Sequence, residues 1–224
     1  GAFTHTVGGN WTKAGTFTAT GSTIDFNGTG AGNIAASNFQ NVIFSGAGTK
    51  TATGALTIAG DVTISNNFTA GAFTHTVGGD WTKTGTFTAT GSTIDFNGAG
   101  AANISAGNFQ NVTFSGAGTK TATGALTIAG NVSLTNNFSA GSFTHTVTGN
   151  FTGAGTFTEG TSTINYNGAA QTVFPGTHNN LTISGTGSKT TTGVTVNGIF
   201  SIEGNATCIP TVAPTYGSAA TLQY

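Results

Sequence analysis

Three histidines recur at one position of a long repeat and are the first residues here that suggest chemistry. His5, His75 and His145 each stand in a Thr-His-Thr tripeptide. Neutral imidazole is a common zinc ligand, but a zinc site needs several ligands that converge on one ion. No acid or cysteine stands beside them at ligand spacing, and in stacked coils they would lie roughly 19 Å apart. We interpret them as surface residues copied by duplication, and we expect no metal or cofactor.

The acidic residues are the next candidates, because paired carboxylates perform glycoside hydrolysis. Asp25 and Asp95 are equivalent in the repeat, but Asn165 replaces them in the third copy and the chain has no arginine. Calcium binding by turns rich in Asp and Asn is an alternative, although the Gly-Gly-x-Gly-x-Asp pattern of calcium-bound β-rolls is missing. We therefore predict that the chain is not an enzyme. The six acids are Asp25, Asp61, Asp80, Asp95, Glu159 and Glu203.

Two further patterns suggest binding functions. Thr-x-Thr pairs, such as Thr4/Thr6 and Thr51/Thr53, resemble the threonine arrays of ice-binding solenoids, but they are interrupted within each copy. Trp11 and Trp81 have the flat rings that stack on sugars, but Phe151 replaces them in the third copy, which favours a place in the core. An ice-binding solenoid and a carbohydrate-binding adhesin stalk remain alternative functions.

The composition excludes several classes of protein. Only 5% of the 224 residues are charged and the net charge is -1, whereas roughly a quarter of an average domain is charged. Five basic residues cannot form the patch that nucleic acid requires. A membrane span needs about 20 consecutive apolar residues, which the chain does not contain. A single cysteine excludes a disulfide scaffold.

A repeat of 70 residues dominates the sequence. GAFTHTVGGNW begins at Gly1, GAFTHTVGGDW at Gly71 and the diverged GSFTHTVTGNF at Gly141. We divide the chain into repeat 1 (1–70), repeat 2 (71–140), diverged repeat 3 (141–204) and a C-terminal tail or docking segment (205–224). The chain begins on a repeat boundary without Met, as expected of a mature product or of an excerpt from a longer protein.

A finer period lies inside each copy. Ile58 aligns with Val77 and Val62 with Trp81, each 19 residues later, and short segments such as NVTFSG alternate apolar with polar residues. Alternation of this kind is typical of strands with one buried face. The sequence therefore predicts an all-β parallel β-solenoid, with four coils per copy, about 12 to 13 coils in total and a length of roughly 60 Å. The alternative is three tandem antiparallel modules, with hairpin turns at Asn27-Gly28 and its copies.

The solenoid interpretation assigns places to the side chains. Threonine is expected outside, and Gly and Asn at corners with left-handed backbone. Apolar residues that recur with the coil period are expected to stack inside, in the predicted core rows Phe26, Phe44, Ile58, Val62, Phe68, Phe96, Phe114, Ile128 and Val132.

The amino-acid sequence of the third copy and of the tail resembles that of a known group of proteins. NLTISGTGSKT (Asn180 to Thr190), TVNGIFSIEGNAT (Thr195 to Thr207) and PTYGSAATLQY (Pro214 to Tyr224) are similar to segments of the repeat-rich, adhesin-like secreted surface proteins of Bacteroidota-like bacteria. The resemblance implies a parallel β-helix, export and an extracellular or cell-surface location. It implies no catalytic residues.

Together these features predict a non-enzymatic, adhesive extracellular structural protein that binds no nucleic acid and does not insert into a membrane. We expect a rod that assembles head to tail into a homo-oligomer or filament, with a surface glycan or other ligand left open. The first copy looks like an interior segment, and the tail is apolar enough to dock. The predicted assembly residues are Cys208, Ile209, Tyr216, Leu222 and Tyr224, and we expect Val212 in the same tail to contribute.

Overall fold

Alternating apolar and polar residues produce short strands with one buried face. In β16 (Asn111–Phe114), Val112 and Phe114 are buried while Asn111 and Thr113 point outward. β-Branched and aromatic residues suit such a half-buried surface. The computed structural model describes residues 1–209 and 213–224, and this part of the chain contains strands of two to five residues and no helix. Consequently none of these residues forms a helix able to cross a membrane.

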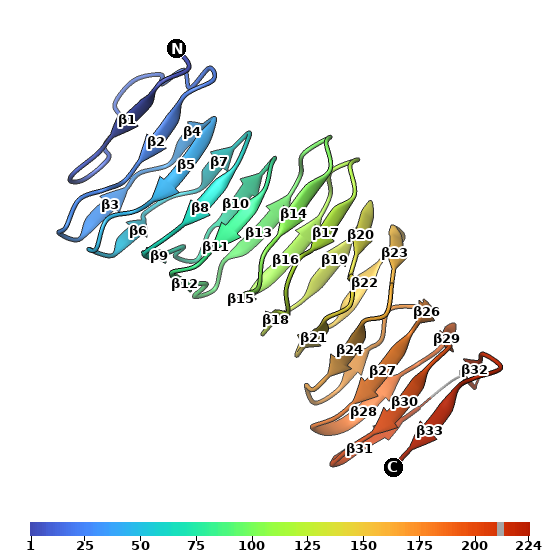
Figure 1. Ribbon diagram of the computed structural model, residues 1–224. Coiled ribbons are helices and arrows are strands. Elements are labelled where there is room, and N and C mark those ends of the chain that lie inside the picture. The colour runs from blue at the N-terminus through green and yellow to red at the C-terminus, as the bar shows by residue number, and fades with distance from the viewer. Residues whose placement is uncertain (210–212) are drawn as a thin grey trace.

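The strands stack on three faces of a parallel β-solenoid of about 11 turns (Figure 1). Face one contains β1 (Thr4–Thr6), β2 (Thr23–Asp25), β5 (Asn41–Phe44), β8 (Val62–Ile64), β11 (Trp81–Lys83), β14 (Ala102–Ile104), β17 (Lys120–Ala122), β20 (Asn137–Ser139), β23 (Thr156–Thr158), β26 (Gly176–His178), β29 (Val194–Val196) and β32 (Thr215–Tyr216). Face two contains β4 (Ser37–Phe39), β7 (Leu56–Ile58), β10 (Thr74–Val77), β13 (Thr93–Phe96), β16, β19 (Val132–Leu134), β22 (Phe151–Gly153), β25 (Gln171–Thr172), β28 (Thr186–Thr190) and β31 (Asn205–Cys208). Face three contains β3 (Gly32–Ile34), β6 (Lys50–Ala52), β9 (Asn67–Thr69), β12 (Thr86–Thr88), β15 (Gly107–Phe109), β18 (Leu126–Ile128), β21 (Thr144–Val147), β24 (Thr163–Tyr166), β27 (Asn180–Ile183), β30 (Ile199–Ile202) and β33 (Thr221–Gln223).

The strand register matches the fine period of the sequence. Ile58 lies beside Val77, and Val62 lies beside Trp81, as the 19-residue spacing predicts. Every pairing between the described strands is parallel, so the alternative of three antiparallel modules is wrong. Asn27-Gly28 and its copies are corners between parallel strands on different faces and not hairpin turns.

The number of coils differs from the sequence prediction. Thr23 begins β2 and its equivalent Thr93 begins β13, so one 70-residue copy spans eleven strands, or three and two-thirds turns. The prediction of four coils per copy, and of 12 to 13 in all, is too high, because a coil takes about 19 residues and not 17.5. At about 4.8 Å per coil, 11 turns extend roughly 53 Å.

The fractional turn rotates each copy by one face relative to the copy before it. His5 lies on face one in β1, His75 on face two in β10 and His145 on face three in β21. Lys50, Lys120 and Lys189 are distributed in the same way, in β6, β17 and β28. Equivalent side chains therefore never stack on one another, and each side of the rod displays every part of the repeat in turn.

The core consists of inward rows that run along the solenoid axis. Phe26, Phe44 and Phe68 stack with ring centroids 5.7 and 4.1 Å apart, and Phe96, Phe114 and Phe138 repeat this at 5.8 and 4.3 Å. Such offset aromatic pairs add stability beyond the area they bury. The predicted core residues all lie inside, each at most 4% exposed: Phe26, Phe44, Ile58, Val62, Phe68, Phe96, Phe114, Ile128 and Val132.

The corners need glycine mainly because neighbouring coils approach closely, and not because of left-handed backbone as the sequence suggested. None of the described non-glycine residues has positive φ, so the Asn corners are ordinary backbone. Gly28 and Gly98 also lack positive φ, but a Cβ on either would collide with the carbonyl oxygen of the glycine stacked beneath it, Gly8 or Gly78. The left-handed glycines lie elsewhere, at positions such as Gly71 and Gly91.

Candidate functional site

Two of the three repeated histidines are core residues, which corrects the expectation that they lie on the surface. His75 and His145 are each 2% exposed, whereas His5, at the N-terminal end, is exposed. In the strand Thr74–Val77 the outward residues are the threonines, so His75 and Val77 both point inward. The strand alternation in Thr-His-Thr-Val carried this signal, because a buried Val two residues after a histidine places that histidine on the same buried face.

Both ring nitrogens of these histidines are used by the backbone. The Leu56 N–H donates to His75 Nδ1 at 3.1 Å, and His75 Nε2 lies 2.8 Å from the Ala70 carbonyl oxygen. His145 repeats the arrangement with Leu126 and Ala140. A neutral imidazole protonated on Nε2 satisfies both contacts. Burial lowers the pKa of both side chains, and the bond to the carbonyl opposes the shift only in part.

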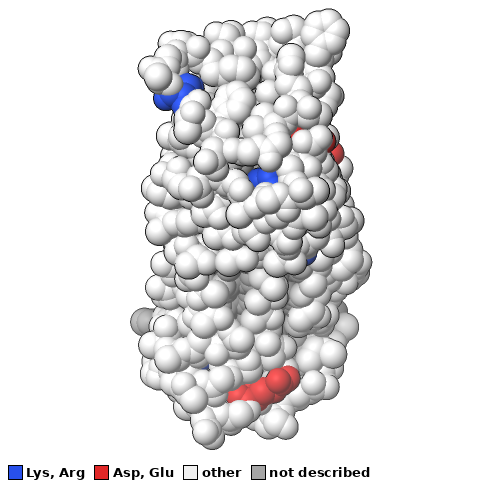
Figure 2. Space-filling view, turned by 90° about the vertical axis from the view of Figure 1, so that its left-hand side faces the viewer, with Lys and Arg blue, Asp and Glu red and all other residues white. Residues whose placement is uncertain are grey.

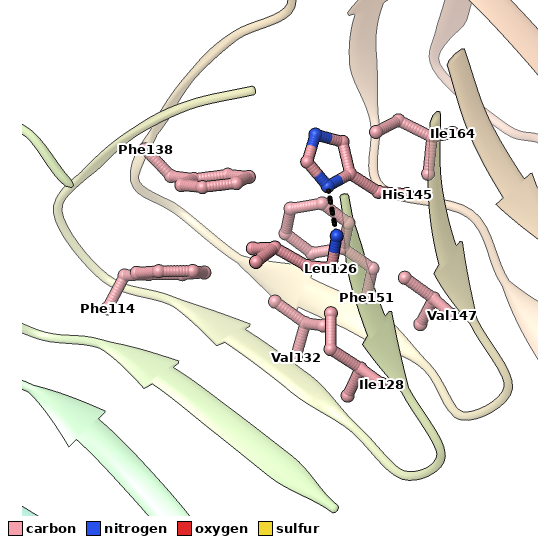
Figure 3. A pocket seen from close by; sticks show the side chains of 9 residues that line it. All are labelled: Phe114, Leu126, Ile128, Val132, Phe138, His145, Val147, Phe151 and Ile164. Carbon is pink, nitrogen blue, oxygen red and sulfur yellow. Dashed lines mark hydrogen bonds between the residues drawn. The ribbon is translucent and has the colours of Figure 1, made fainter. Parts of the chain in front are cut away.

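An apolar cavity of about 10 Å³ lies beside His145 (Figure 3). The imidazole forms one wall, and its Nδ1 is already bonded to the backbone of Leu126. The cavity is too small for a substrate, and no polar group of its lining is left to bind one. Its lining consists of Phe114, Leu126, Ile128, Val132, Phe138, His145, Val147, Phe151 and Ile164.

The most unusual polar groups are three buried lysines. Lys50, Lys120 and Lys189 are 0% exposed, although lysine is almost never fully buried. Lys120 Nζ donates to the carbonyl oxygens of Gly98, Gly100 and Gly118 at 2.7, 2.9 and 2.8 Å. Burial lowers the pKa of all three lysines, while three carbonyl acceptors match the three N–H donors of a charged ammonium group.

The other two lysines have the same surroundings. Lys50 Nζ donates to Gly28, Gly30 and Gly48 at 2.8, 2.9 and 2.7 Å. Lys189 Nζ donates to Gly168, Ala169 and Thr186 at 2.6, 2.8 and 2.9 Å. We call each set of three oxygens a carbonyl cage.

Sequence reasoning missed these lysines because it considered the basic residues only as a possible patch for nucleic acid. A signal was available: lysine persists at this position even in the diverged third copy, while Lys13 and Lys83 become Gly153.

The acids mostly connect neighbouring coils. Ser45 Oγ donates to Asp25 at 2.6 Å, and Ser115 does the same to Asp95. Asp61 accepts the backbone N–H of Asp80 at 2.8 Å. In the second copy asparagines form the same ladder, with Asn131 accepting the N–H of Asn150, so the charge is not required. Among the described residues no three His, Cys, Asp or Glu side chains form a group able to hold a metal.

The threonine arrays are short and divided among the faces. In the second copy Thr74/Thr76, Thr93/Asp95 and Asn111/Thr113 form two columns over three coils of face two. The corresponding arrays of the first and third copies lie on faces one and three. Rotation by one face per copy thus keeps the two-column arrays from continuing along one face, and on face two Asp95 and Ser133 interrupt the column that contains Thr57 and Thr76.

The tryptophans are poorly placed to stack on a sugar. Trp81 is 2% exposed, and Trp11 is half-buried with its Nε1 donating to Ser37 Oγ at 2.7 Å. Phe151, which replaces them in the third copy, is buried as well.

The exposed large apolar side chains gather at the two ends of the rod. Ile209, Tyr216, Leu222 and Tyr224 of the predicted assembly set are exposed, and Tyr224 is 93% exposed. Ile199 is exposed near them, and Phe3 is exposed at the opposite end. Cys208 is a half-buried free thiol 3.0 Å from Thr191 Oγ1. Val212, also expected in this set, and Pro210 lie outside the described residues.

Comparisons with models of known families, with curated proteins and with solved structures find no match for the chain. The solenoid that the resemblance to adhesin-like surface proteins implied is present, but a relationship to those proteins receives no support. The architecture is therefore established from the chain's own geometry: a parallel β-solenoid built from tandem repeats.

Proposed function

We propose that this chain is a non-enzymatic, extracellular structural protein, a stiff rod whose copies associate end to end into a filament at a cell surface. The observation that carries the proposal is the contrast between the sides of the rod and its ends. Exposed large apolar side chains are found at the first coil and the last coils, and not along the described sides between them.

The sides suit an inert spacer. They consist of outward Thr, Asn and Ser side chains, and Figure 2 shows few charged groups along the visible face. Absence of charge lets identical coils stack without repulsion between neighbours. Adhesion and an extracellular location are consistent with such a surface and form part of the proposal.

The junctions between copies supply a template for the joint between chains. Where copy 2 follows copy 1, Val77 and Trp81 cover Ile58 and Val62. At the C-terminal end the tail covers the equivalent row in the same way, with Tyr216 on Val196 and Leu222 on Phe200. We infer that the first coil of a second chain adds to the tail as one coil adds to another, with backbone pairing along the open sheet edges.

The first coil has the side chains for this contact. Val7, Trp11 and Phe17 are half-buried, whereas their equivalents Val77, Trp81 and Phe87 are at most 7% exposed. A coil added to this end would bury Val7, Trp11 and Phe17 to the extent that their equivalents in copy 2 are buried. The ends also carry opposite charges, because Lys13 is exposed in the first coil and Glu203 near the last.

Sedimentation of the purified chain tests the proposal. We expect linear oligomers that grow with concentration, and a monomer for the double variant Ile209→Lys/Tyr224→Lys, which places two charges on the C-terminal end. Thr127→Lys, on an exposed position in the middle of the rod, is the matched control and should assemble like the parent. A parent that stays monomeric at about 1 mM, where even weak interfaces are populated, contradicts end-to-end assembly.

A further inference from the structure

The carbonyl cages have the composition of a cation-binding site. In the cage of Lys120, Gly98 and Gly100 belong to the loop between β13 and β14, and Gly118 belongs to the loop between β16 and β17. Two neighbouring coils therefore direct their oxygens at one point. Among the described residues no carboxylate accepts a hydrogen bond from these ammonium groups, so carbonyl dipoles hold the positive charge.

Convergence of the carbonyls follows from the glycine corners. The loops stack so closely that a Cβ at Gly116 or Gly118 would collide with the backbone of the loop beneath. In these stacked loops the carbonyl oxygens of Gly98, Gly100 and Gly118 meet the Lys120 ammonium group. The Asn136 and Asn137 side chains donate to other carbonyls of the corner, those of Ser115 and Ala117. Gly98 and Gly118 are half-buried and Gly100 is exposed. A carbonyl shielded from water and left unpaired destabilises the fold, so a corner of this shape favours a donor or a cation.

Gln171 shows which side chain satisfies a corner where a backbone N–H lies beside the carbonyl oxygens. It lies one coil before Lys189 in the same row. Its Nε2 donates to the Val147 and Gly149 carbonyls, and its Oε1 accepts the N–H of Gly168. A neutral amide fits there because the partners include a backbone N–H. Where three carbonyls and no N–H converge, the chain places an ammonium group.

We propose that each carbonyl cage is a binding site for a small monovalent cation of the ammonium type, occupied in this chain by a tethered lysine. Contacts of 2.6 to 2.9 Å are those of an ammonium group donating to carbonyl oxygens. A cage emptied by truncation of the lysine would take a free ammonium, methylammonium or potassium ion, because backbone carbonyls replace the hydration shell of such ions.

Chemical rescue of Lys120→Ala tests this site. We expect the variant to melt below the parent and to recover with methylammonium chloride, by about 3 °C between none and 1 M beyond the effect of the same concentration of tetramethylammonium chloride. Tetramethylammonium has the charge but no N–H donor and is too large for the cage.

Two controls separate cage binding from a general salt effect. The parent, whose cages are filled, should respond equally to both salts. Lys120→Met, whose apolar side chain fills the space of the lysine stem, should be destabilised, but methylammonium should not restore its stability. Should Lys120→Ala be unfolded in plain buffer, refolding on addition of methylammonium supports the site. An Ala variant that responds to both salts as the parent does, or that does not refold with methylammonium, overturns the proposal.

Discussion

The polar residues of the core make the sharpest predictions at the scale of single residues. His75 and His5 are the same residue of the repeat in opposite surroundings, one buried and one exposed. His75→Asp buries a carboxylate in an apolar row and removes the N–H donor that faces the Ala70 carbonyl oxygen, so it should cost more than about 4 kcal/mol. His5→Asp should change stability by less than about 0.5 kcal/mol. Urea denaturation of the two variants measures the difference, and equal midpoints would place His75 outside.

The buried histidines also predict a pH dependence. Burial lowers the pKa of His75, His145 and His178 in the folded chain, whereas an unfolded histidine titrates near 6.5. Below that pH the unfolded chain binds more protons than the folded one. The free energy of unfolding should therefore be highest above about pH 6.5 and fall as the pH decreases, by up to about 1.4 kcal/mol per pH unit for each histidine.

Urea unfolding at pH 8, 6 and 5 checks this slope. His5→Gln, which removes the exposed histidine, should leave the profile unchanged. A free energy of unfolding that is flat from pH 8 to 5 is incompatible with neutral histidines in the core.

An unsatisfied tryptophan predicts a stabilising substitution. Trp11 Nε1 donates to Ser37, but Gly107 occupies the equivalent of Ser37 in the second copy, and buried Trp81 Nε1 has no partner. A Cβ at Gly107 would lie 2.9 Å from the Phe109 ring, which must shift to admit a side chain. Gly107→Ser should restore the bond and be about 1 kcal/mol more stable than Gly107→Ala, which meets the same ring. Gly107→Ala is the control, because it reproduces the loss of unfolded-chain freedom without the hydroxyl. If Ser proves no more stable than Ala in thermal denaturation, the missing bond does not matter.

At the scale of elements, the corners are specified by glycine and the strands by alternation. Gly98 and Gly100 lie in the same corner, but a Cβ at Gly98 would collide with the Gly78 carbonyl oxygen, while nothing lies within 4 Å of one at Gly100. Gly98→Ala should therefore destabilise the chain by about 2 to 3 kcal/mol. Gly100→Ala should be close to neutral. Thermal melting of the pair decides the point, and equal losses would mean that the corners do not stack as described.

The strands and their register could be read from the sequence, because period-2 alternation and the 19-residue spacing are local patterns. The rotation between copies could not be recognised so easily. The 70-residue period suggested an integral number of coils, and only the count of eleven strands per copy reveals the two-thirds turn.

The polar interior was the other failure of sequence reasoning. The places of His75 and Lys120 depend on backbone groups of a neighbouring coil, Leu56 and Gly98, and residue type alone suggested solvent. Strand alternation in Thr-His-Thr-Val did mark His75 as inward. The signal for Lys120 was the persistence of lysine at its position in all three copies.

At the scale of the whole molecule, the solenoid is a rod. Each stretch of about 19 residues makes one coil and advances the chain by one strand spacing along the rod axis. Because each copy is rotated by one face, the outward residues stacked in one column of a face come from different positions of the repeat in successive copies. One such column on face two begins at Asn38 and passes through Thr57 of copy 1. It continues through Thr76, Asp95, Thr113 and Ser133 to Thr152 of copy 3.

The distance between spin labels at Thr57 and Thr152 tests this arrangement most directly. Both positions are exposed, and a Cys208→Ser background leaves only the two introduced cysteines. Five coils separate them in one column, so pulsed electron resonance of Thr57→Cys/Thr152→Cys should give a single narrow peak at about 24 Å. A broad distribution, or a distance beyond about 35 Å as expected for separate modules placed end to end, would contradict a continuous parallel solenoid.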